Sequence, residues 1–143
     1  MARGFIRYKS GYKYQLHEAY EATIEINPYT EINTDYINLG TVGNLLIKKG
    51  YAWDGPSGPT FDTRNFMRGS LVHDAVYQLM RQQHLPVSFK GAADDELIKM
   101  CREDGMSRLR AWWVYKGVDW FAGSAVEPDS AKEVFRAPEN GEQ

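Results

Sequence analysis

A short segment near the middle of the chain separates two halves with different residue patterns. Residues 54–60, Asp-Gly-Pro-Ser-Gly-Pro-Thr, contain two glycines and two prolines, so this segment cannot continue a regular helix or strand. Before it, tyrosine, isoleucine and threonine are frequent, which is typical of strands. After it, apolar residues recur at helical spacing. The order of strands first and helices second predicts an α+β fold.

The first half predicts a small N-terminal antiparallel β-sheet of roughly three to five strands. Residues 22–26 alternate between apolar and polar side chains with a period of two, and Asn27-Pro28 ends the run. We expect a turn at 40–44. The alternating run lies within a strand-like region at 11–27, and the other predicted strand regions are 4–8, 36–39 and 45–49, which leads into 51–53.

The second half predicts three helices. The first is capped by Asp62 or Thr63 and extends over about 64–82. The second extends over about 90–103, with Gly105 as its C-cap, and the third over about 107–122, ending at Gly123. We expect residues 1–125 to form a single domain, with a β-rich part at 1–53 and a helical part at 63–123. Residues 126–143 are polar and are expected to form a tail.

Composition and charge exclude several classes of protein. The 143 residues are 43% hydrophobic and 25% charged, which excludes disorder of the whole chain. The net charge of −2 does not suit a protein whose main partner is nucleic acid. The longest apolar stretches have about five residues, so no transmembrane segment is expected. The N-terminus lacks the apolar core of a signal peptide and the chain has one cysteine, which favours the cytoplasm.

The residues that suggest chemistry gather around His73 in the first predicted helix. Tyr77 follows four residues later on the same helix face, and Asp74 is adjacent in sequence. Asp94 begins the second predicted helix, and Asp54 begins the Gly/Pro segment. A histidine that acts as a general base needs an acceptor for its second ring N–H. A hard cation needs several oxygen ligands, and these carboxylates with the loop carbonyls supply both.

The available ligands favour calcium or magnesium over zinc. Oxygen donors dominate around His73, and the chain contains no His-x-x-x-His or Cys-x-x-Cys spacing. Ser57 lies in the Gly/Pro segment without a Gly-x-Ser-x-Gly pattern, so we expect a turn residue rather than a nucleophile.

The order of these motifs resembles a bacteriophage and prophage family, domain-of-unknown-function family 1353. The resemblance rests on Asp54-Gly55-x-Ser57-x-Pro59, then His73-Asp74-x-x-Tyr77, then Ala93-Asp94. It extends over about residues 45–122. The resemblance implies a viral protein in the cytoplasm of a bacterial host or associated with the virion.

The same residues also resemble the site of bacterial and fungal phospholipase A2 enzymes. These enzymes have His-Asp-x-x-Tyr on one helix and a further aspartate on the next, antiparallel helix. The resemblance implies that His73 is the general base, that Asp94 orients its imidazole and that Tyr77 supports the pair. It also implies a calcium site formed by Asp54, the Gly55 carbonyl and Asp74, and a phospholipid or another ester as substrate.

Two features differ from the secreted phospholipases. Those enzymes contain disulfide bonds and have no counterpart of the β-rich first 50 residues. One alternative is therefore a non-catalytic virion, tail or lysis accessory protein that contacts other phage proteins. In such a protein His73, Tyr77 and Asp94 form a buried polar network that fixes helix packing.

The third predicted helix carries a concentration of aromatic residues. Trp112, Trp113, Tyr115, Trp120 and Phe121 alternate with basic residues. A helix that is apolar on two sides is most often buried, so we expect its aromatic residues to pack in the core. The alternatives are a membrane-surface face or an interface through which a regulator binds a host protein.

Overall fold

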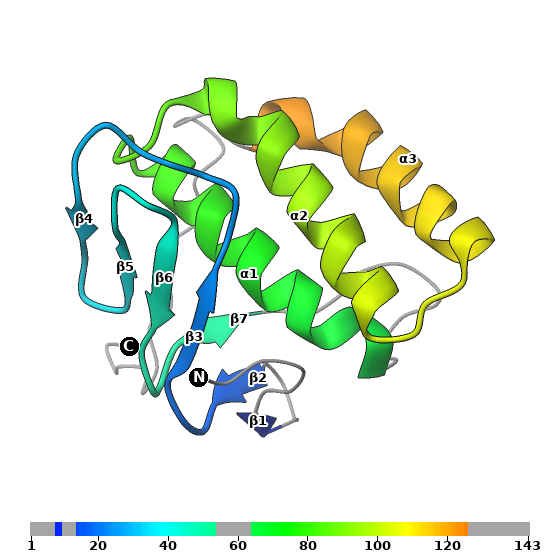
Figure 1. Ribbon diagram of the computed structural model, residues 1–143, viewed down its shortest axis with the longest axis horizontal. Coiled ribbons are helices and arrows are strands. Elements are labelled where there is room, and N and C mark those ends of the chain that lie inside the picture. Colours follow the sequence, from blue (N-terminus) through cyan, green and yellow to red (C-terminus); the bar gives the residue numbers. More distant parts are fainter. Residues whose placement is uncertain (1–7, 10–13, 54–63, 126–143) are drawn as a thin grey trace. The chain divides into compact units, whose positions relative to one another are not determined.

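The computed structural model describes residues 8–9, 14–53 and 64–125, and it describes side chains for residues 14–53 and 65–117. The strands and the helices belong to two separate compact units. One unit holds the seven strands of the described residues and the other holds the three α-helices (Figure 1). This layout confirms the predicted α+β fold class.

The first unit contains two antiparallel sheets where the sequence predicted one. The smaller sheet has the strand order β1–β2–β7, formed by Tyr8–Lys9, Tyr14–Leu16 and Ala52–Trp53. The larger sheet has the order β3–β6–β5–β4, formed by Tyr20–Thr23, Asn44–Ile47, Ile37–Leu39 and Ile32–Asn33.

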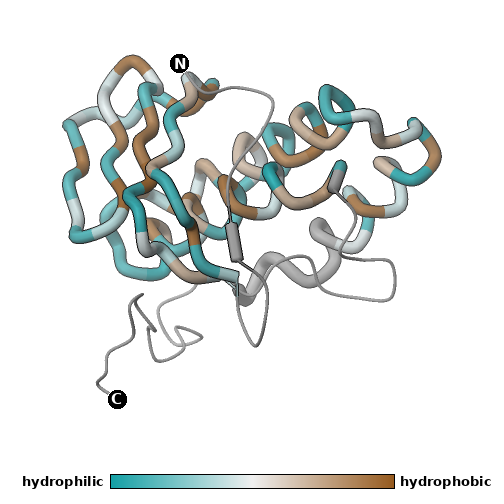
Figure 2. Tube along the Cα trace, turned by 90° about the horizontal axis from the view of Figure 1, so that it is seen from below, coloured by the Kyte–Doolittle hydropathy of each residue, from teal (hydrophilic) through white to brown (hydrophobic). Residues whose placement is uncertain are grey.

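Apolar residues of the larger sheet face a common core. Ile37 pairs with Ile47 and Leu39 pairs with Leu45 across β5 and β6, and all four side chains are buried. This period of two buries one face of the strand pair. Hydrophobic and hydrophilic stretches accordingly alternate along the chain (Figure 2).

The strand predicted at residues 22–26 is shifted toward the N-terminus. β3 ends at Thr23, yet Ile24 and Ile26 are buried and the intervening Glu25 is exposed. Beyond the strand, the Ile24 amide donates to the Gly43 carbonyl at 2.8 Å. A Cβ on Gly43 would lie 2.1 Å from the Ile24 carbonyl oxygen, so only glycine fits there. The alternation therefore predicted burial correctly, although the regular ladder stops earlier.

The second unit contains α1 (Arg64–Arg81), α2 (Lys90–Glu103) and α3 (Arg108–Ala125), with a short 3₁₀ helix, η1 (Val87–Phe89), before α2. The first two helices lie at or within one residue of their predicted ends. The predicted end of the third helix at Gly123 is wrong, because the helix continues to Ala125. The predicted caps Asp62 and Thr63 and the predicted tail 126–143 lie outside the described residues.

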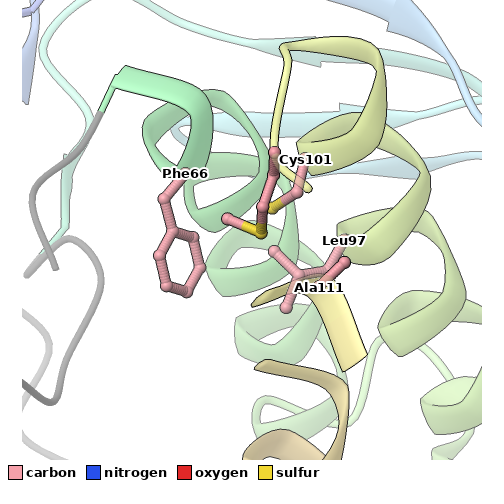
Figure 3. Close-up of a cluster of buried hydrophobic side chains, with 5 residues drawn as sticks. Phe66, Leu97, Cys101 and Ala111 are labelled. Carbon is pink, nitrogen blue, oxygen red and sulfur yellow. The ribbon is translucent and has the colours of Figure 1, made fainter. Parts of the chain in front are cut away.

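The three helices share an apolar cluster in which α2 lies between α1 and α3 (Figure 1). Phe66 of α1, Leu97 and Cys101 of α2, and Ala111 of α3 form it together with Met106 (Figure 3). The close contact of α1 and α2 depends on Gly69. A Cβ at this position would meet the Leu97 Cδ1 at 2.9 Å and the Cys101 Sγ at 3.2 Å.

A buried arginine joins α1 to the end of α2. The Arg68 side chain is 5% exposed, and its guanidinium bonds the Asp104 carboxylate through Nε at 3.0 Å and Nη2 at 3.1 Å. Nη2 also lies 2.8 Å from the Glu103 Oε1. The paired carboxylates offset the cost of removing this charge from water.

The helix ends adopt left-handed conformations that turn the chain. Gly105 follows α2 with φ +104°, and the Met106 amide bonds the Cys101 carbonyl at 2.9 Å, a Schellman-type end. This supports the prediction of Gly105 at the end of the second helix. The α1 end has the same kind of turn at Gln83, with φ 66°, and the His84 amide bonds the Leu79 carbonyl at 2.8 Å.

Candidate functional site

Two helices bring the predicted acid–base residues together. His73 and Tyr77 lie four residues apart on α1, so they share one face, and their ring centroids are 4.0 Å apart. Asp94 lies in the second turn of α2, which runs antiparallel to α1 (Figure 1). The connecting segment 82–89, which includes η1, determines where along the α1 axis α2 begins. Asp94 consequently lies level with His73, 21 residues earlier in the sequence.

Asp94 is the centre of this cluster. Its Oδ1 lies 2.8 Å from the His73 Nε2 and accepts a hydrogen bond from the Tyr77 hydroxyl at 2.5 Å. Its Oδ2 accepts a hydrogen bond from the Lys90 ammonium at 3.0 Å. The side chain is 2% exposed, and both carboxylate oxygens are thus satisfied in a place that water hardly reaches.

The surroundings of Asp94 favour its ionised form. Burial alone would raise the pKa of the carboxyl, but the hydrogen bonds from His73, Tyr77 and Lys90 stabilise the carboxylate and lower the pKa below its usual 3.8. Asp94 therefore carries a negative charge at neutral pH. A buried carboxylate beside an imidazole stabilises the imidazolium that forms when histidine takes up a proton.

The two ring nitrogens of His73 face different carboxylates. Its Nε2 faces Asp94, whereas its Nδ1 lies 4.0 Å from the Asp74 Oδ1, too far for a hydrogen bond. Burial lowers the pKa of His73, but the two neighbouring carboxylates outweigh this and hold the pKa above the usual 6.5. The side chain is 11% exposed, so a small molecule can approach only part of the ring.

The residues predicted to bind calcium are only partly described. Asp74 is more exposed than His73, and its carboxylate faces the Nδ1 side of the ring. Asp54 and Gly55, like Ser57, lie outside the described residues. Among the residues that the structure describes, no group of three or more His, Cys, Asp or Glu is arranged to hold a metal ion. Asp74 alone supplies one hard oxygen donor, and the calcium site stays a prediction.

Lys90 was not among the residues predicted from the sequence. This lysine lies four residues before Asp94 on α2, and its ammonium bonds the Asp94 Oδ2 at 3.0 Å. A Lys–Asp pair at this spacing on a helix is a recognisable pattern, so the residue could have been found. The other histidines with described side chains, His17 and His84, are exposed.

The expectation of a buried third helix is wrong for its two adjacent tryptophans. Trp112 and Trp113 are 51% and 63% exposed, and Leu109 is also exposed. The buried side of α3 is instead formed by Ala111, with Val114 packed partly against the helical core. Small and branched residues suffice on this side because α3 packs closely on α2.

Comparisons of the chain with protein-family models, curated proteins and solved structures gave no match. No helix among the described residues has the length and apolar character needed to cross a bilayer.

Proposed function

We propose that this protein is an ester hydrolase of the phospholipase A2 type, encoded by a phage or prophage, with His73 as its general base. The support comes from one observation: the Nε2 of His73 is held 2.8 Å from Asp94, while Nδ1 is directed toward the more exposed Asp74. This arrangement suits a mechanism in which Asp94 orients the ring through Nε2 and Nδ1 takes up the proton.

The reaction step follows from the different roles of the two ring nitrogens. The Nδ1 atom takes a proton from water as the water oxygen attacks the ester carbonyl. The resulting imidazolium is stabilised by Asp94, whose charge Tyr77 and Lys90 hold in place. The same nitrogen then returns the proton to the leaving alkoxide, so the histidine is regenerated.

A divalent cation would contribute one further element. Asp74 would provide a carboxylate ligand, joined by Asp54 and the Gly55 carbonyl as the resemblance to phospholipases implies. Calcium or magnesium at this place would polarise the ester carbonyl and stabilise the oxyanion. Asp74 is an oxygen donor, as these cations require.

The test is release of fatty acid from phospholipid micelles, measured by mass spectrometry with calcium, magnesium, zinc or EDTA. We expect cation-dependent release by the native protein and none by His73→Ala. The matched control is His84→Ala, which removes an exposed histidine just after the end of α1. This variant should retain activity. Asp74→Asn should lose the release that depends on the cation.

His73→Ala is expected to fold, because Asp94 keeps its contacts with Tyr77 and Lys90. If this variant does not fold, His73→Gln provides the test, since its amide can still donate to Asp94 but is not basic at neutral pH. Failure of the folded native protein to hydrolyse phospholipids and simpler esters with every cation would contradict the proposal.

The second candidate is a non-catalytic virion, tail or lysis accessory protein. It is supported by the deep burial of Asp94 and by the pairing of both its oxygens, which suit a network that fixes helix packing. Under this alternative, His73→Ala lowers the melting temperature strongly and no esterase activity accompanies the native protein. The two candidates therefore differ in both measurements.

A further inference from the structure

The outer side of α3 carries a stripe of three large apolar residues and one lysine. Leu109, Trp112, Trp113 and Lys116 occupy positions i, i+3, i+4 and i+7, which fall on one side of a helix. Leu109, Trp112 and Trp113 are each more than half exposed. We call these four residues the α3 stripe. Large apolar side chains gathered in this way mark interaction surfaces more often than scattered ones do.

The two indole rings are arranged against each other and against a cation. Trp112 and Trp113 meet edge to face with centroids 5.3 Å apart. The Lys116 ammonium lies 5.7 Å from the Trp112 ring centroid, within the range of a cation–π contact. The stripe therefore presents aromatic rings and a positive charge at one place.

The charge of this segment differs in sign from that of the whole chain. α3 contains three basic residues, Arg108, Arg110 and Lys116, and one acidic residue, Asp119, so its net charge is +2, whereas the chain has a net charge of −2. The acids that precede the helix, Glu103 and Asp104, bond Arg68. This local excess of positive charge is complementary to an anionic surface.

The same charges argue against pairing of the stripe with a second copy of itself. In a two-fold interface the same patch lies on both subunits, so the positive charges of Arg108 and Lys116, which are exposed, would lie close to the same charges of the second copy. Trp112 and Trp113 are exposed on one side of a helix that also carries basic residues, an arrangement typical of helices that lie at a bilayer surface.

We propose that the α3 stripe docks onto the surface of an anionic phospholipid bilayer. Leu109, Trp112 and Trp113 enter the boundary between headgroups and acyl chains, where indole rings are favoured. Arg108 and Lys116, whose side chains are exposed, attract the lipid phosphates. The helix lies in the plane of the interface, which accords with the absence of a bilayer-spanning helix among the described residues. This docking does not depend on the proposed hydrolase activity.

The experiment is co-sedimentation of the full chain with vesicles of ether-linked phosphatidylcholine, with and without ether-linked phosphatidylglycerol. Ether lipids cannot be hydrolysed by an esterase, so binding is measured separately from catalysis. We expect binding to the phosphatidylglycerol vesicles that weakens as salt is added, and much weaker binding to phosphatidylcholine alone.

Three variants separate the contributions. The double variant Trp112→Ser/Trp113→Ser should weaken binding about tenfold or more. Lys116→Glu should reduce the preference for phosphatidylglycerol. The control is Tyr29→Ser, which removes an aromatic side chain that is 90% exposed in the strand-containing unit and should bind as the native protein does.

Three results would overturn the proposal. One is a folded native protein that does not sediment with phosphatidylglycerol vesicles. Another is equal binding by the native protein and the double tryptophan variant. The third is a concentration-dependent dimer, seen by analytical ultracentrifugation, that the double variant abolishes while vesicle binding is absent, since this would assign the stripe to a protein interface.

Discussion

The interface between α1 and α2 and the outer side of α3 depart in opposite ways from the usual arrangement of a folded protein. The α1–α2 interface buries ionised groups, Asp94 and Arg68, and provides each with bonded partners. The outer side of α3 exposes two tryptophans. Polar residues are usually outside and large apolar ones inside. The contrast separates a region where the fold depends on each charge from one that is available for binding.

Breaking the Arg68 contacts should have the largest effect on stability. Arg68→Met keeps most of the apolar stem but leaves Asp104 without its guanidinium partner in a place that is only 12% exposed. We expect the free energy of unfolding, measured with urea, to fall by about 3 kcal/mol. The matched control is Glu103→Gln, whose carboxylate is half exposed and should cost about 0.5 kcal/mol or less. Equal losses in the two variants would contradict this account.

Adding one methyl group at Gly69 should have the next largest effect. The Cβ would press on Leu97 and Cys101, and we expect Gly69→Ala to cost about 2 kcal/mol of unfolding free energy. Gly117 in α3 has open space around the same position. Gly117→Ala should therefore stabilise the helix by about 0.5–1 kcal/mol. Shifts in the same direction for both variants would show that helix contact is not the cause.

Acid should weaken the contribution of Asp94 at the same interface. Burial alone would raise its pKa, but bonds from His73, Tyr77 and Lys90 lower it below 3.8. The group therefore adds stability above pH 3.8, and that contribution is lost as the pH falls through the lowered pKa. Urea titrations of the native protein and Asp94→Asn across about pH 2–6 should show a gap of about 1 kcal/mol that closes in acid. A gap that is constant with pH would contradict this expectation.

Changes on the outer side of α3 should have the smallest effect. Trp112→Ser/Trp113→Ser is expected to change the unfolding free energy by about 0.5 kcal/mol or less, because both side chains are largely exposed. Ala111, the neighbouring residue, faces Leu97 and Cys101 in the buried cluster. Ala111→Leu should cost about 1–3 kcal/mol through overpacking. If the double tryptophan variant loses as much, the stripe belongs to the core after all.

The sequence predicted the parts of this molecule that depend on local pattern. Helical spacing located α1 and α2 closely, and the alternation through Ile24 and Ile26 predicted their burial. Aromatic content did not predict which side of α3 is buried, because tryptophan suits a core and a surface equally. That choice depends on the space left by α2, where Ala111 fits, and such space is set by tertiary packing.

Three residues of the candidate site could be predicted from the sequence motif, and a fourth could not. The motif grouped His73, Tyr77 and Asp94, and the distances join them at Asp94. The spacing of 21 residues between the histidine and the aspartate does not by itself place the two side chains at the same position along the helix axes. Their relative position depends on η1 and on the turn at Gln83, which connect α1 to α2. Lys90 could not be predicted from the motif, because an ammonium is neither a base at neutral pH nor a metal ligand.

The burial of Cys101 has a consequence for kinetics. The thiol is fully buried between the helices, and burial, together with the charge of Asp104, raises its pKa to about 12. A thiol reagent at mildly alkaline pH can therefore react only with molecules whose helices have transiently separated. Since this is the single cysteine of the chain, its rate of modification measures how often the helical unit opens. Local opening of the helical unit can thus be followed through the native cysteine, and no label has to be introduced.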